Sequence, residues 1–343
     1  MPALRYVGQA GGIEETLTAR AGIPFVPIST GQIRGRAPWD AARSAARMRE
    51  GAAQVTAFIR DFRPDAVFVT GGYVAAPVAW AAWRAGLPLL IYLPDLEPGL
   101  EIRVTSRLAT RVAVSFPEVA SYFPGKAEVT GYPVRHDIWV ADCRAARAAL
   151  GLTGALPALL VFGGSRGSRS INRALSQSLP ALLPRCEVVH ITGELDWPEV
   201  STARESGLDH DLRARYHVYP YLHDEMTHAL AAADLVVARA GASVLGEFPA
   251  LGLPAILAPY PHAGRHQYVN AAYLAARDAA VIVEDDALVA ELSPTVLGLL
   301  DDPQRLAAMS SAARQLARPD AADRIANLLF ELAGSPSSGT VRH

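Results

Sequence analysis

A glycine-rich segment with the chemistry of an anion site follows the apolar run Leu160–Phe162. Its sequence is Gly163-Gly164-Ser165-Arg166-Gly167-Ser168. Glycines let the backbone approach a ligand closely, and the free N–H groups at the start of a helix favour a negative charge. The segment therefore predicts a diphosphate site, with a tight strand-to-helix turn that holds no ligand as the alternative. It lacks the G-x-G-x-x-G spacing, so it does not favour a nicotinamide dinucleotide.

A second segment of this kind follows the apolar run Leu235–Ala238. Its sequence is Arg239-Ala240-Gly241-Ala242-Ser243, with Glu247 shortly after it. We expect Ser243 to cap a helix and Glu247 to lie about one turn into that helix. A carboxylate there can accept hydrogen bonds from two vicinal hydroxyls, as on a ribose. The alternative is that Glu247 interacts only with the helix dipole.

A third segment, before Asn270, is dense in hydrogen-bonding groups. Its sequence is Pro259-Tyr260-Pro261-His262-Ala263-Gly264-Arg265-His266-Gln267. We expect a strand-to-helix loop, either at a ligand or simply at the surface. The proline and glycine in it do not favour the helix that His262 and His266 would need to bind a metal together. Asp209-His210-Asp211 fits the D-x-D pattern of metal-dependent sugar transferases, but it does not follow a buried strand, so no metal site is predicted.

Two loops in the N-terminal part of the chain also follow apolar runs. Thr70-Gly71-Gly72-Tyr73 follows one run, and Asp95 follows the next, Pro88–Leu93. Ligands of α/β sheets lie outside the carboxyl ends of the strands, so these groups are placed to face one. A simple turn at the glycines and an ordinary acidic loop at Asp95 are the alternatives.

Apolar, strand-like runs alternate with alanine-rich, helix-like runs along the whole chain. This order predicts an α/β fold with parallel sheets and helices on both faces. The strands that we expect are Arg5–Gly8, Ala66–Thr70, Pro88–Leu93, Val112–Ser115, Leu159–Phe162, Glu187–Thr192, Tyr216–Tyr219, Leu235–Ala238, Ala255–Ala258 and Ala280–Val283.

The alternation restarts once, which predicts two domains. We place the boundary near residue 135, after Gly131-Tyr132-Pro133-Val134-Arg135 and before a charged helix over Asp142–Leu150. The first domain then spans residues 1–135 and the second 136–320. A last helix over residues 321–333 is expected to pack back on the first domain, and the polar tail, 334–343, to be disordered.

Composition bounds the class of protein. The 343 residues are half apolar and carry a net charge of −2 with no long basic run, so a nucleic-acid partner is not expected. The two cysteines, Cys143 and Cys186, have no metal-ligand spacing and indicate a reducing compartment. The N-terminus does not resemble a signal peptide, and no apolar stretch approaches the roughly 20 residues that span a bilayer. We expect a cytoplasmic protein that at most lies on a membrane.

Several of these segments together resemble the MurG family of peptidoglycan glycosyltransferases. These enzymes add N-acetylglucosamine from UDP-N-acetylglucosamine to undecaprenyl-diphospho-muramoyl-pentapeptide, converting lipid I to lipid II. The resemblance covers Arg5 to about Ala333. It is carried by TGGYVAAPV at 70–78, GYPVR at 131–135, VFGGSRGSRSIN at 161–172, ADLVVARAGAS at 233–243 and ALGLPAILAPYPHAGRHQYVNA at 250–271.

The resemblance implies a fold and a set of site residues. The fold is GT-B, with two Rossmann-like domains whose parallel sheets face a cleft, the acceptor domain first and the UDP-sugar domain second. The diphosphate would lie at Gly163, Gly164 and Ser165, where Arg166 replaces the usual glutamine and could reach a phosphate. The remaining donor-side residues are Arg135 of the hinge segment, Arg239, Gly241, Ala242 and Ser243, Glu247 for the ribose, His266 and Gln267 for the sugar, and Leu222 or His223 for the uracil. Gly71, Gly72 and Tyr73 lie on the acceptor side.

The implied mechanism is a direct displacement at the anomeric carbon with inversion. No metal or other cofactor is needed if a helix start and backbone N–H groups stabilise the leaving UDP. A general base must still take the proton of the acceptor hydroxyl. The family's His-Glu-Gln-Asn segment is Tyr92-Leu93-Pro94-Asp95 here, which makes Asp95 the candidate base or acceptor-positioning residue.

The resemblance begins at the family's second strand. The first strand, its Gly-Gly-Thr-Gly-Gly-His loop and the following helix are therefore expected to be missing. The first strand of a doubly wound sheet is central, and its deletion would leave backbone groups unpaired. We therefore expect a start site placed too far downstream.

Contact with the cytoplasmic face of the membrane is a further hypothesis. An arginine-rich stretch with Trp39 and Phe58 could hold an anionic surface, although a solvated helix face explains it equally well. The arginines are Arg34, Arg36, Arg43, Arg47, Arg49, Arg60 and Arg63.

Three other functions stay open. The altered segment at 92–95 suits transfer to a different lipid, such as a diacylglycerol. The missing first loop suits a non-catalytic UDP-sugar-binding protein. A nucleotide-sugar epimerase can have the same fold.

Overall fold

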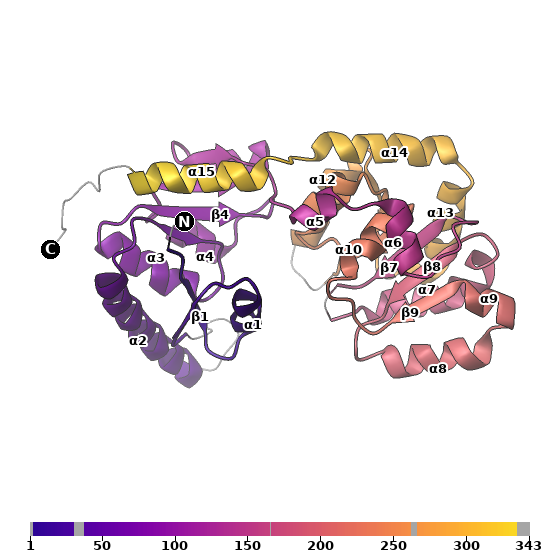
Figure 1. Cartoon of the computed structure of the whole chain (residues 1–343), viewed down its shortest axis with the longest axis horizontal. Coiled ribbons are helices and arrows are strands. Elements are labelled where there is room, and N and C mark those ends of the chain that lie inside the picture. Colours follow the sequence, from indigo (N-terminus) through magenta and orange to yellow (C-terminus); the bar gives the residue numbers. More distant parts are fainter. Residues whose placement is uncertain (1–2, 31–37, 165, 262–265, 335–343) are drawn as a thin grey trace. The chain divides into compact units, whose positions relative to one another are not determined.

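Parallel β-sheets with helices packed on them make up both parts of the computed structural model (Figure 1). The structure describes residues 3–30, 38–164, 166–261 and 266–334. The chain divides into two compact units: Met1–Gly131 together with Ala322–His343, and Tyr132–Ala321. The division after Gly131 lies close to the boundary expected near residue 135.

The first unit contains a four-stranded parallel sheet, in the order β3-β4-β5-β6, and a separate parallel pair, β1-β2. Its elements are β1 (Tyr6–Gln9), α1 (Ile13–Arg20), β2 (Phe25–Ile28), α2 (Pro38–Phe62), β3 (Val67–Val69), α3 (Ala75–Arg84), β4 (Leu89–Leu93), α4 (Leu100–Thr105), β5 (Arg111–Val114), the 3-10 helix η1 (Pro117–Tyr122), β6 (Ala127–Val129) and α15 (Ala321–Gly334). Within the described residues no ladder joins β1 or β2 to β3.

Burial in the first unit is greatest at β4. All five residues of this strand are buried, as expected for an apolar strand covered on both faces. Leu90 and Tyr92 share a buried cluster with Ile325 and Leu332 of α15, so the C-terminal helix packs on this sheet. By contrast, Phe68 of β3 is exposed.

The second unit contains a six-stranded parallel sheet in the order β12-β11-β10-β7-β8-β9. Its elements are α5 (His136–Trp139), α6 (Cys143–Ala149), β7 (Ala158–Phe162), α7 (Arg169–Leu182), β8 (Glu187–Ile191), α8 (Trp197–Gly207), α9 (His210–Ala214), β9 (Tyr216–Tyr219), α10 (Met226–Ala232), β10 (Leu235–Ala238), α11 (Val244–Leu251), β11 (Ala255–Leu257), α12 (His266–Ala275), β12 (Ala280–Ile282), α13 (Leu288–Leu300) and α14 (Pro303–Leu316).

The core of the second unit follows from apolar periodicity. Ile171, Leu175, Leu179 and Leu182 recur along α7 at helical spacing and are all buried against the sheet. Strands β7 and β10 are buried along almost their whole length, which explains their continuous apolar sequences. Strand β8 is equally buried but contains the polar residues Glu187 and His190. In the sheet β7 lies between β8 and β10, so the direction in which successive strands are added reverses at β7.

All ten expected strands are present, and the structure contains two more, β2 and β6, that the sequence does not predict. Strand β2 contains Pro27, which argues against a strand because proline cannot donate to a ladder. Strand β6 has only three residues at the edge of its sheet and includes Glu128. Both are too short and too polar or irregular to be recognised from periodicity. Gly334, where we expected the polar tail to begin, is the last residue of α15. Residues 335–343 of the expected tail lie outside the described residues.

Candidate functional site

The reversal of strand order at β7 marks a site at the carboxyl edge of the second unit's sheet. Adjacent parallel strands whose connections run in opposite directions leave a crevice outside their carboxyl ends. Strand β7 ends at Phe162 and pairs there with Ala238, the end of β10. The two loops that leave this point carry the first two segments singled out from the sequence.

The glycines after β7 are required by the backbone of the turn itself. A side chain at Gly163 would place its Cβ 2.2 Å from the backbone nitrogen of Ser168, and one at Gly167 would place it 2.2 Å from the carbonyl oxygen of Thr192. Gly164 has a φ of +90° but open space around it. Gly163 and Gly167 are therefore needed for the turn to pack, whereas Gly164 has free space beside it. Ser165, expected at the diphosphate, lies outside the described residues, and Arg166 is exposed.

Helix α7 starts directly after this turn and supplies donors for an anion. Its N-cap residue, Ser168, makes no side-chain capping hydrogen bond. The first N–H groups of a helix have no partner within the helix, and its dipole places partial positive charge there. The start of α7 can therefore hold a phosphate group next to Gly164.

Arg239 occupies the centre of the site but already has partners on three loops. It is buried, and its guanidinium donates to the hydroxyls of Ser168 (2.8 Å) and Ser170 (2.7 Å) and to the carbonyl of Ala258 (2.9 Å). It also pairs with Asp285 at 2.6 Å. These contacts indicate that Arg239 fixes the loops after β7, β11 and β12 and so positions the site.

The segment after β10 opens helix α11. Gly241 and Ala242 are half-buried and Ser243 is exposed. The expectation that Ser243 caps the helix through its side chain is wrong: Ser243 stands at the N-cap but has helical φ and ψ and makes no capping bond. Its hydroxyl instead interacts with the carboxyl of Glu247, one turn further on.

Glu247 is a largely buried carboxyl beside a cation. Burial raises its pKa, and the nearby Arg135 guanidinium and the Ser243 hydroxyl oppose that shift. Arg135 donates to the Thr227 hydroxyl (3.2 Å) and lies 3.6 Å from Asp137, which accepts from the same hydroxyl at 2.6 Å. The structure thus brings Arg135 and Glu247 together, although 112 residues separate them in the chain.

The remaining donor-side residues follow β11 and β9 at the same edge of the sheet. His266 begins α12 and is exposed, and the Gln267 side chain accepts from the backbone N–H of Tyr260 at 2.8 Å. Residues 262–265 of this loop lie outside the described residues. Leu222 is half-buried and His223 is exposed after β9, where the His223 ring lies 4.7 Å from that of Tyr221. Among the described residues, no hydrogen bond or ion pair joins them to Glu247.

The acceptor-side residues lie at the carboxyl edge of the first unit's sheet. Gly71 and Gly72 follow β3 with φ of +95° and +86°, a conformation that favours glycine, and Tyr73 is 47 % exposed. Asp95 follows β4 and is half-buried. Since β3 and β4 are parallel neighbours, these two loops leave the sheet side by side.

The structure adds a residue that the sequence did not suggest. Glu101, on α4, faces the glycine loop: a side chain on Gly71 would place its Cβ 3.4 Å from Glu101 Oε2. Oε1 of the same carboxyl is buried and has no hydrogen-bond partner in the described part of the chain. Burial raises the pKa of Glu101, and hydrogen bonds from the Gly72 backbone and the Thr105 side chain oppose that shift. No sequence motif marks Glu101, because the glycine loop beside it follows a different strand, β3.

Comparison with known proteins decides the family. Residues 2–114 match the model of the glycosyltransferase family 28 N-terminal domain, and residues 158–325 match that of the C-terminal domain. A UDP-N-acetylglucosamine–N-acetylmuramyl-(pentapeptide) pyrophosphoryl-undecaprenol N-acetylglucosamine transferase of Roseiflexus sp. is 42% identical over 95% of this chain and 83% of its own length. The enzyme of the same name from Desulforudis audaxviator is 40% identical, over 96% and 90%. The chain belongs to this family of glycosyltransferases.

Solved structures agree with the family 28 assignment. The crystal structure of Acinetobacter baumannii MurG has a TM-score of 0.72 and 26% identity, covering 95% of this chain and 90% of its own. A UDP-GlcNAc 2-epimerase from Neisseria meningitidis, bound to UDP-GlcNAc, has a TM-score of 0.69 at 14% identity, which shows a common fold only. The glycosyltransferase has the GT-B fold, and the second unit is its family 28 C-terminal domain.

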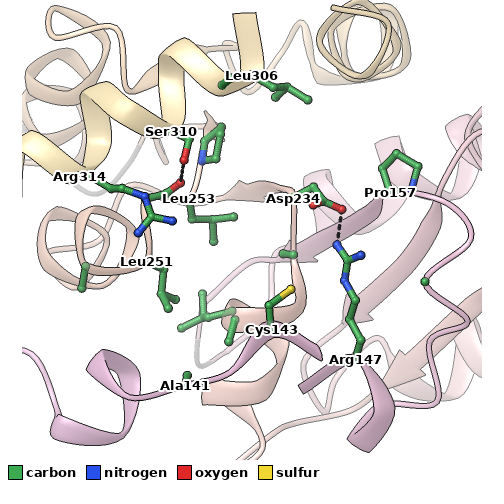
Figure 2. Close-up of a pocket in the computed structure, with 18 of the residues that line it drawn as sticks. Ala141, Cys143, Arg147, Pro157, Asp234, Leu251, Leu253, Leu306, Ser310 and Arg314 are labelled. Carbon is green, nitrogen blue, oxygen red and sulfur yellow. Dashed lines mark hydrogen bonds and ion pairs between the residues drawn. The ribbon is translucent and has the colours of Figure 1, made fainter. Parts of the chain in front are cut away.

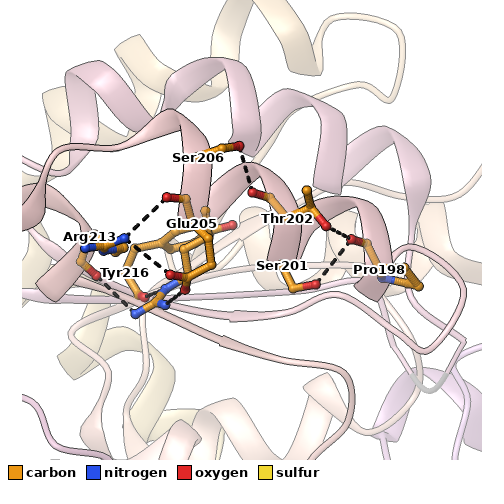
Figure 3. Close-up of polar contacts among 8 residues, drawn as sticks. Pro198, Ser201, Thr202, Glu205, Ser206, Arg213 and Tyr216 are labelled. Atoms are coloured by element: carbon orange, nitrogen blue, oxygen red, sulfur yellow. Dashed lines mark hydrogen bonds and ion pairs between the residues drawn. The ribbon is translucent and has the colours of Figure 1, made fainter.

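The D-x-D segment of the glycosyltransferase has a structural role. Asp209 caps α9 by accepting the N–H of Leu212 at 2.9 Å. Arg213 of α9 in turn pairs with Glu205 of α8 (Figure 3). Beside this pair, the Ser206 hydroxyl donates to the Thr202 carbonyl. Among the described residues no group of three or more His, Cys, Asp or Glu side chains is placed to hold a metal ion.

A cavity of about 730 Å³ lies at the other end of the same sheet. Its lining includes Pro157 and Asp234, which precede β7 and β10, together with Cys143 and Arg147 (Figure 2). Asp234 pairs with Arg147 at 2.5 Å and also accepts the N–H of Ala158. Because this cavity lies at the amino ends of the strands, it is separate from the candidate site at their carboxyl ends.

Proposed function

We propose that this glycosyltransferase transfers N-acetylglucosamine from UDP-N-acetylglucosamine to N-acetylmuramyl-(pentapeptide) pyrophosphoryl-undecaprenol. These are the substrates in the names of its relatives. The observation that carries the proposal is the arrangement at the switch point of the second unit. There an uncapped start of α7, next to Gly164, shares one edge of the sheet with the Glu247 carboxyl.

Each part of this edge suits one part of the donor. The N–H groups at the start of α7 would bind the diphosphate, and Glu247 would accept hydrogen bonds from the ribose hydroxyls. Arg135, beside Glu247, opposes the rise in pKa that burial causes and so favours the charged carboxylate, which can accept both bonds. Gln267 and His266 follow β11 and would contact the sugar.

The reaction is a displacement at the anomeric carbon with inversion. The acceptor oxygen forms the new bond as the bond to the diphosphate breaks, and the leaving UDP takes the electron pair. Preorganised N–H groups at the start of α7 stabilise the charge that develops on that diphosphate, which is the part a divalent cation plays in other transferases. We therefore expect turnover in the presence of a chelator.

The first unit also has features of a membrane-facing surface. Trp80 and Trp83 of α3 are 41% and 42% exposed, and Leu100 and Val104 of the contacting helix α4 are 73% and 52% exposed. Arg84, Arg103 and Arg107 on or next to these helices are exposed cations. Apolar side chains with a basic rim bind an anionic bilayer surface, where a polyprenyl acceptor would be found. We propose that the enzyme works on the cytoplasmic face of the membrane; no described helix is long and apolar enough to cross one.

The arginine-rich stretch 31–63 is a separate candidate for contact with anionic lipid, and its described arginines, Arg47, Arg49, Arg60 and Arg63, are exposed. Helix α2 covers most of it, but Arg34 and Arg36 lie outside the described residues, and the side chains of Trp39 and Arg43 are not described. Phe58 is half-buried and packs against Phe62 in a stacked pair.

The test of function is transfer of labelled N-acetylglucosamine from UDP-N-acetylglucosamine to a lipid I analogue, with chelator present. Product formation with release of UDP is expected. Donor binding without transfer to this acceptor would refute the proposal. Transfer to a diacylglycerol instead would identify another lipid as the acceptor, and consumption of donor without any acceptor would identify an epimerase.

Flotation with vesicles that contain anionic lipid tests the membrane surface. The double variant Trp80→Ser, Trp83→Ser should float less than the native chain. Phe330→Ser, at a position on α15 that is 57% exposed, is the control and should float like the native chain. Flotation that does not depend on the two tryptophans would contradict the assignment of this surface.

A further inference from the structure

The buried hydroxyl of Thr227 lies between two opposite charges of the second unit. Thr227 is near the start of α10 and only 5% exposed. Its hydroxyl accepts a hydrogen bond from the Arg135 guanidinium at 3.2 Å and donates one to the Asp137 carboxylate at 2.6 Å. A hydroxyl has one proton and a guanidinium only donates, so the direction of both bonds is fixed. The Thr227 hydroxyl therefore joins Arg135 to Asp137.

The direct contact between Arg135 and Asp137 is weak by comparison. Arg135 Nη1 lies 3.6 Å from Asp137 Oδ2, and the two side chains are 51% and 48% exposed. Exposed ion pairs contribute little, because solvent screens them and two flexible side chains must be held in one geometry. Thr227 is buried and β-branched, so its side chain has little rotamer freedom to lose. It is the rigid member of the three.

The backbone before Arg135 packs closely against α11, the helix that carries Glu247. A side chain at Gly246 would place its Cβ 2.2 Å from the ring of Tyr132 and 2.9 Å from a methyl group of Val134. The segment can lie this close to α11 only because residue 246 is glycine. Arg135 and Glu247 directly follow these contacting residues in the chain. The backbones of both are thereby fixed near each other, and the direction of the Arg135 side chain depends on its own partners.

Arg135 has two carboxylates within its range. Burial is the main reason why the pKa of Glu247 is raised; Arg135 opposes this rise and Asp137 adds to it. Helices α5, α10 and α14 pack against α11. Their other charged or titratable side chains, which are not causes of the shift, are His136, His228, Arg305 and Arg314. Without the Thr227 hydroxyl, the guanidinium would be free to pair directly with Asp137 and to leave Glu247.

We propose that Thr227 is a positioning residue of the donor site, whose hydroxyl holds the Arg135 guanidinium beside Glu247 and away from a direct pair with Asp137. This rests on the proposed function, in which Glu247 binds the ribose hydroxyls of a nucleoside diphosphate sugar. Thr227 itself is buried and does not touch the ligand. Arg135, at 51% exposure of its side chain, stays accessible to it.

The first test is calorimetric binding of UDP-N-acetylglucosamine. Thr227→Val keeps the shape of the side chain but removes the hydroxyl, and it should weaken binding by roughly three- to tenfold, the range expected for one lost hydrogen bond. Thr227→Ser keeps the hydroxyl and should bind like the native chain. Ser178→Ala is the matched control, because it removes a hydroxyl of α7 that is 4% exposed and donates to the Ala174 carbonyl. It should bind like the native chain, and native affinity in Thr227→Val would overturn the proposal.

A double-mutant cycle shows whether Thr227 acts through Arg135. In an Arg135→Gln background, Thr227→Val should weaken binding much less than it does in the native chain, because the guanidinium that it positions is gone. A general structural effect of the substitution would be the same in both backgrounds. Equal effects of Thr227→Val in the two backgrounds would therefore overturn the proposal.

The pH dependence of binding gives a second readout that a structural role would not move. Affinity should fall between about pH 8 and about pH 5 as Glu247 takes up a proton. Arg135 opposes the raised pKa of Glu247, so releasing Arg135 by Thr227→Val should raise that pKa further. The variant should then lose affinity at a higher pH than the native chain. Identical pH profiles would count against the proposal.

Two further comparisons keep the outcome interpretable. If Thr227→Val does not fold, Thr227→Ala decides: it also lacks the hydroxyl and should weaken binding, and native affinity would overturn the proposal. Failure of the proposed function is recognised in the native chain alone. That chain would then not bind UDP-N-acetylglucosamine, or would bind it without transferring the sugar, before any variant is compared.

Discussion

A buried histidine should make the second unit sensitive to mild acid. His190 of β8 is inaccessible to solvent; its Nδ1 lies 2.7 Å from the Tyr216 hydroxyl and its Nε2 lies 3.0 Å from Asn172 Oδ1. The Asn172 amide nitrogen donates to Thr192 and Asp196, so Oδ1 accepts and Nε2 carries the proton. The neutral ring therefore satisfies both of its nitrogens.

The magnitude follows from the pKa of this ring. Burial lowers the pKa of His190 from 6.5 to about 3, with the Asp196 carboxylate opposing the shift. Between these values the unfolded chain binds a proton that the folded chain does not. The contribution of His190 to stability is therefore complete above the unfolded pKa and is lost as pH falls toward the folded one. From about pH 7.5 to about pH 5, the loss is about 2 kcal/mol.

The assay is unfolding of the full chain in urea at these two pH values. A short pulse of protease, which cleaves only unfolded protein, gives the unfolded fraction at each urea concentration. Peptides of β7 and β8 counted by mass spectrometry report on the second unit alone. His190→Gln keeps a polar side chain but cannot titrate, so its stability should fall by about 2 kcal/mol less than that of the native chain over the same pH range. His228→Gln, at an exposed position on α10, is the control and should fall like the native chain. Parallel losses in native chain and His190→Gln would refute the reasoning.

Three further outcomes are expected. Glu247→Gln should weaken UDP binding in calorimetry by roughly tenfold or more, because hydrogen bonds to a charged acceptor contribute about 1.5–3 kcal/mol; unchanged affinity would remove Glu247 from the ribose site. Gly164→Ala should cost the second unit about 1–2 kcal/mol of stability, because its backbone is left-handed. Gly167→Ala should cost clearly more, because Gly167 also lacks space for a Cβ, and equal melting points for the two variants would contradict this. Arg239→Met should cost about 3–5 kcal/mol of stability by leaving Asp285 without its buried partner, and a native melting temperature would show that the pair is not needed.

Much of the fold can be predicted from the sequence because most of its parallel strands are largely apolar runs. Strands β7, β8 and β10 are buried on both faces, and each is followed by a turn with glycine or proline. The two strands that escape prediction lack this signal: β2 is interrupted by Pro27, and β6 is a three-residue edge strand.

The site can be predicted only where its residues lie within one loop. The segments after β7 and β10 carry local signals, and both lie at the switch point of the sheet. The role of Arg239 is not visible in the same way, because the hydroxyl of Ser168 that it contacts is 71 residues away in the chain. Glu101 is missed for the same reason, since its burial depends on a loop from a neighbouring strand.

The cavity at the amino ends of the strands contains a cysteine that can be modified selectively. Cys143 lines this cavity and is exposed, whereas Cys186 is buried and burial raises the pKa of its thiol to about 12. The sequence contains no other cysteine. A maleimide dye should thus label one position without mutagenesis, at the opposite end of the sheet from the proposed nucleotide site. Fragments tethered through a disulfide at Cys143 could be screened for inhibitors that do not compete with UDP-N-acetylglucosamine.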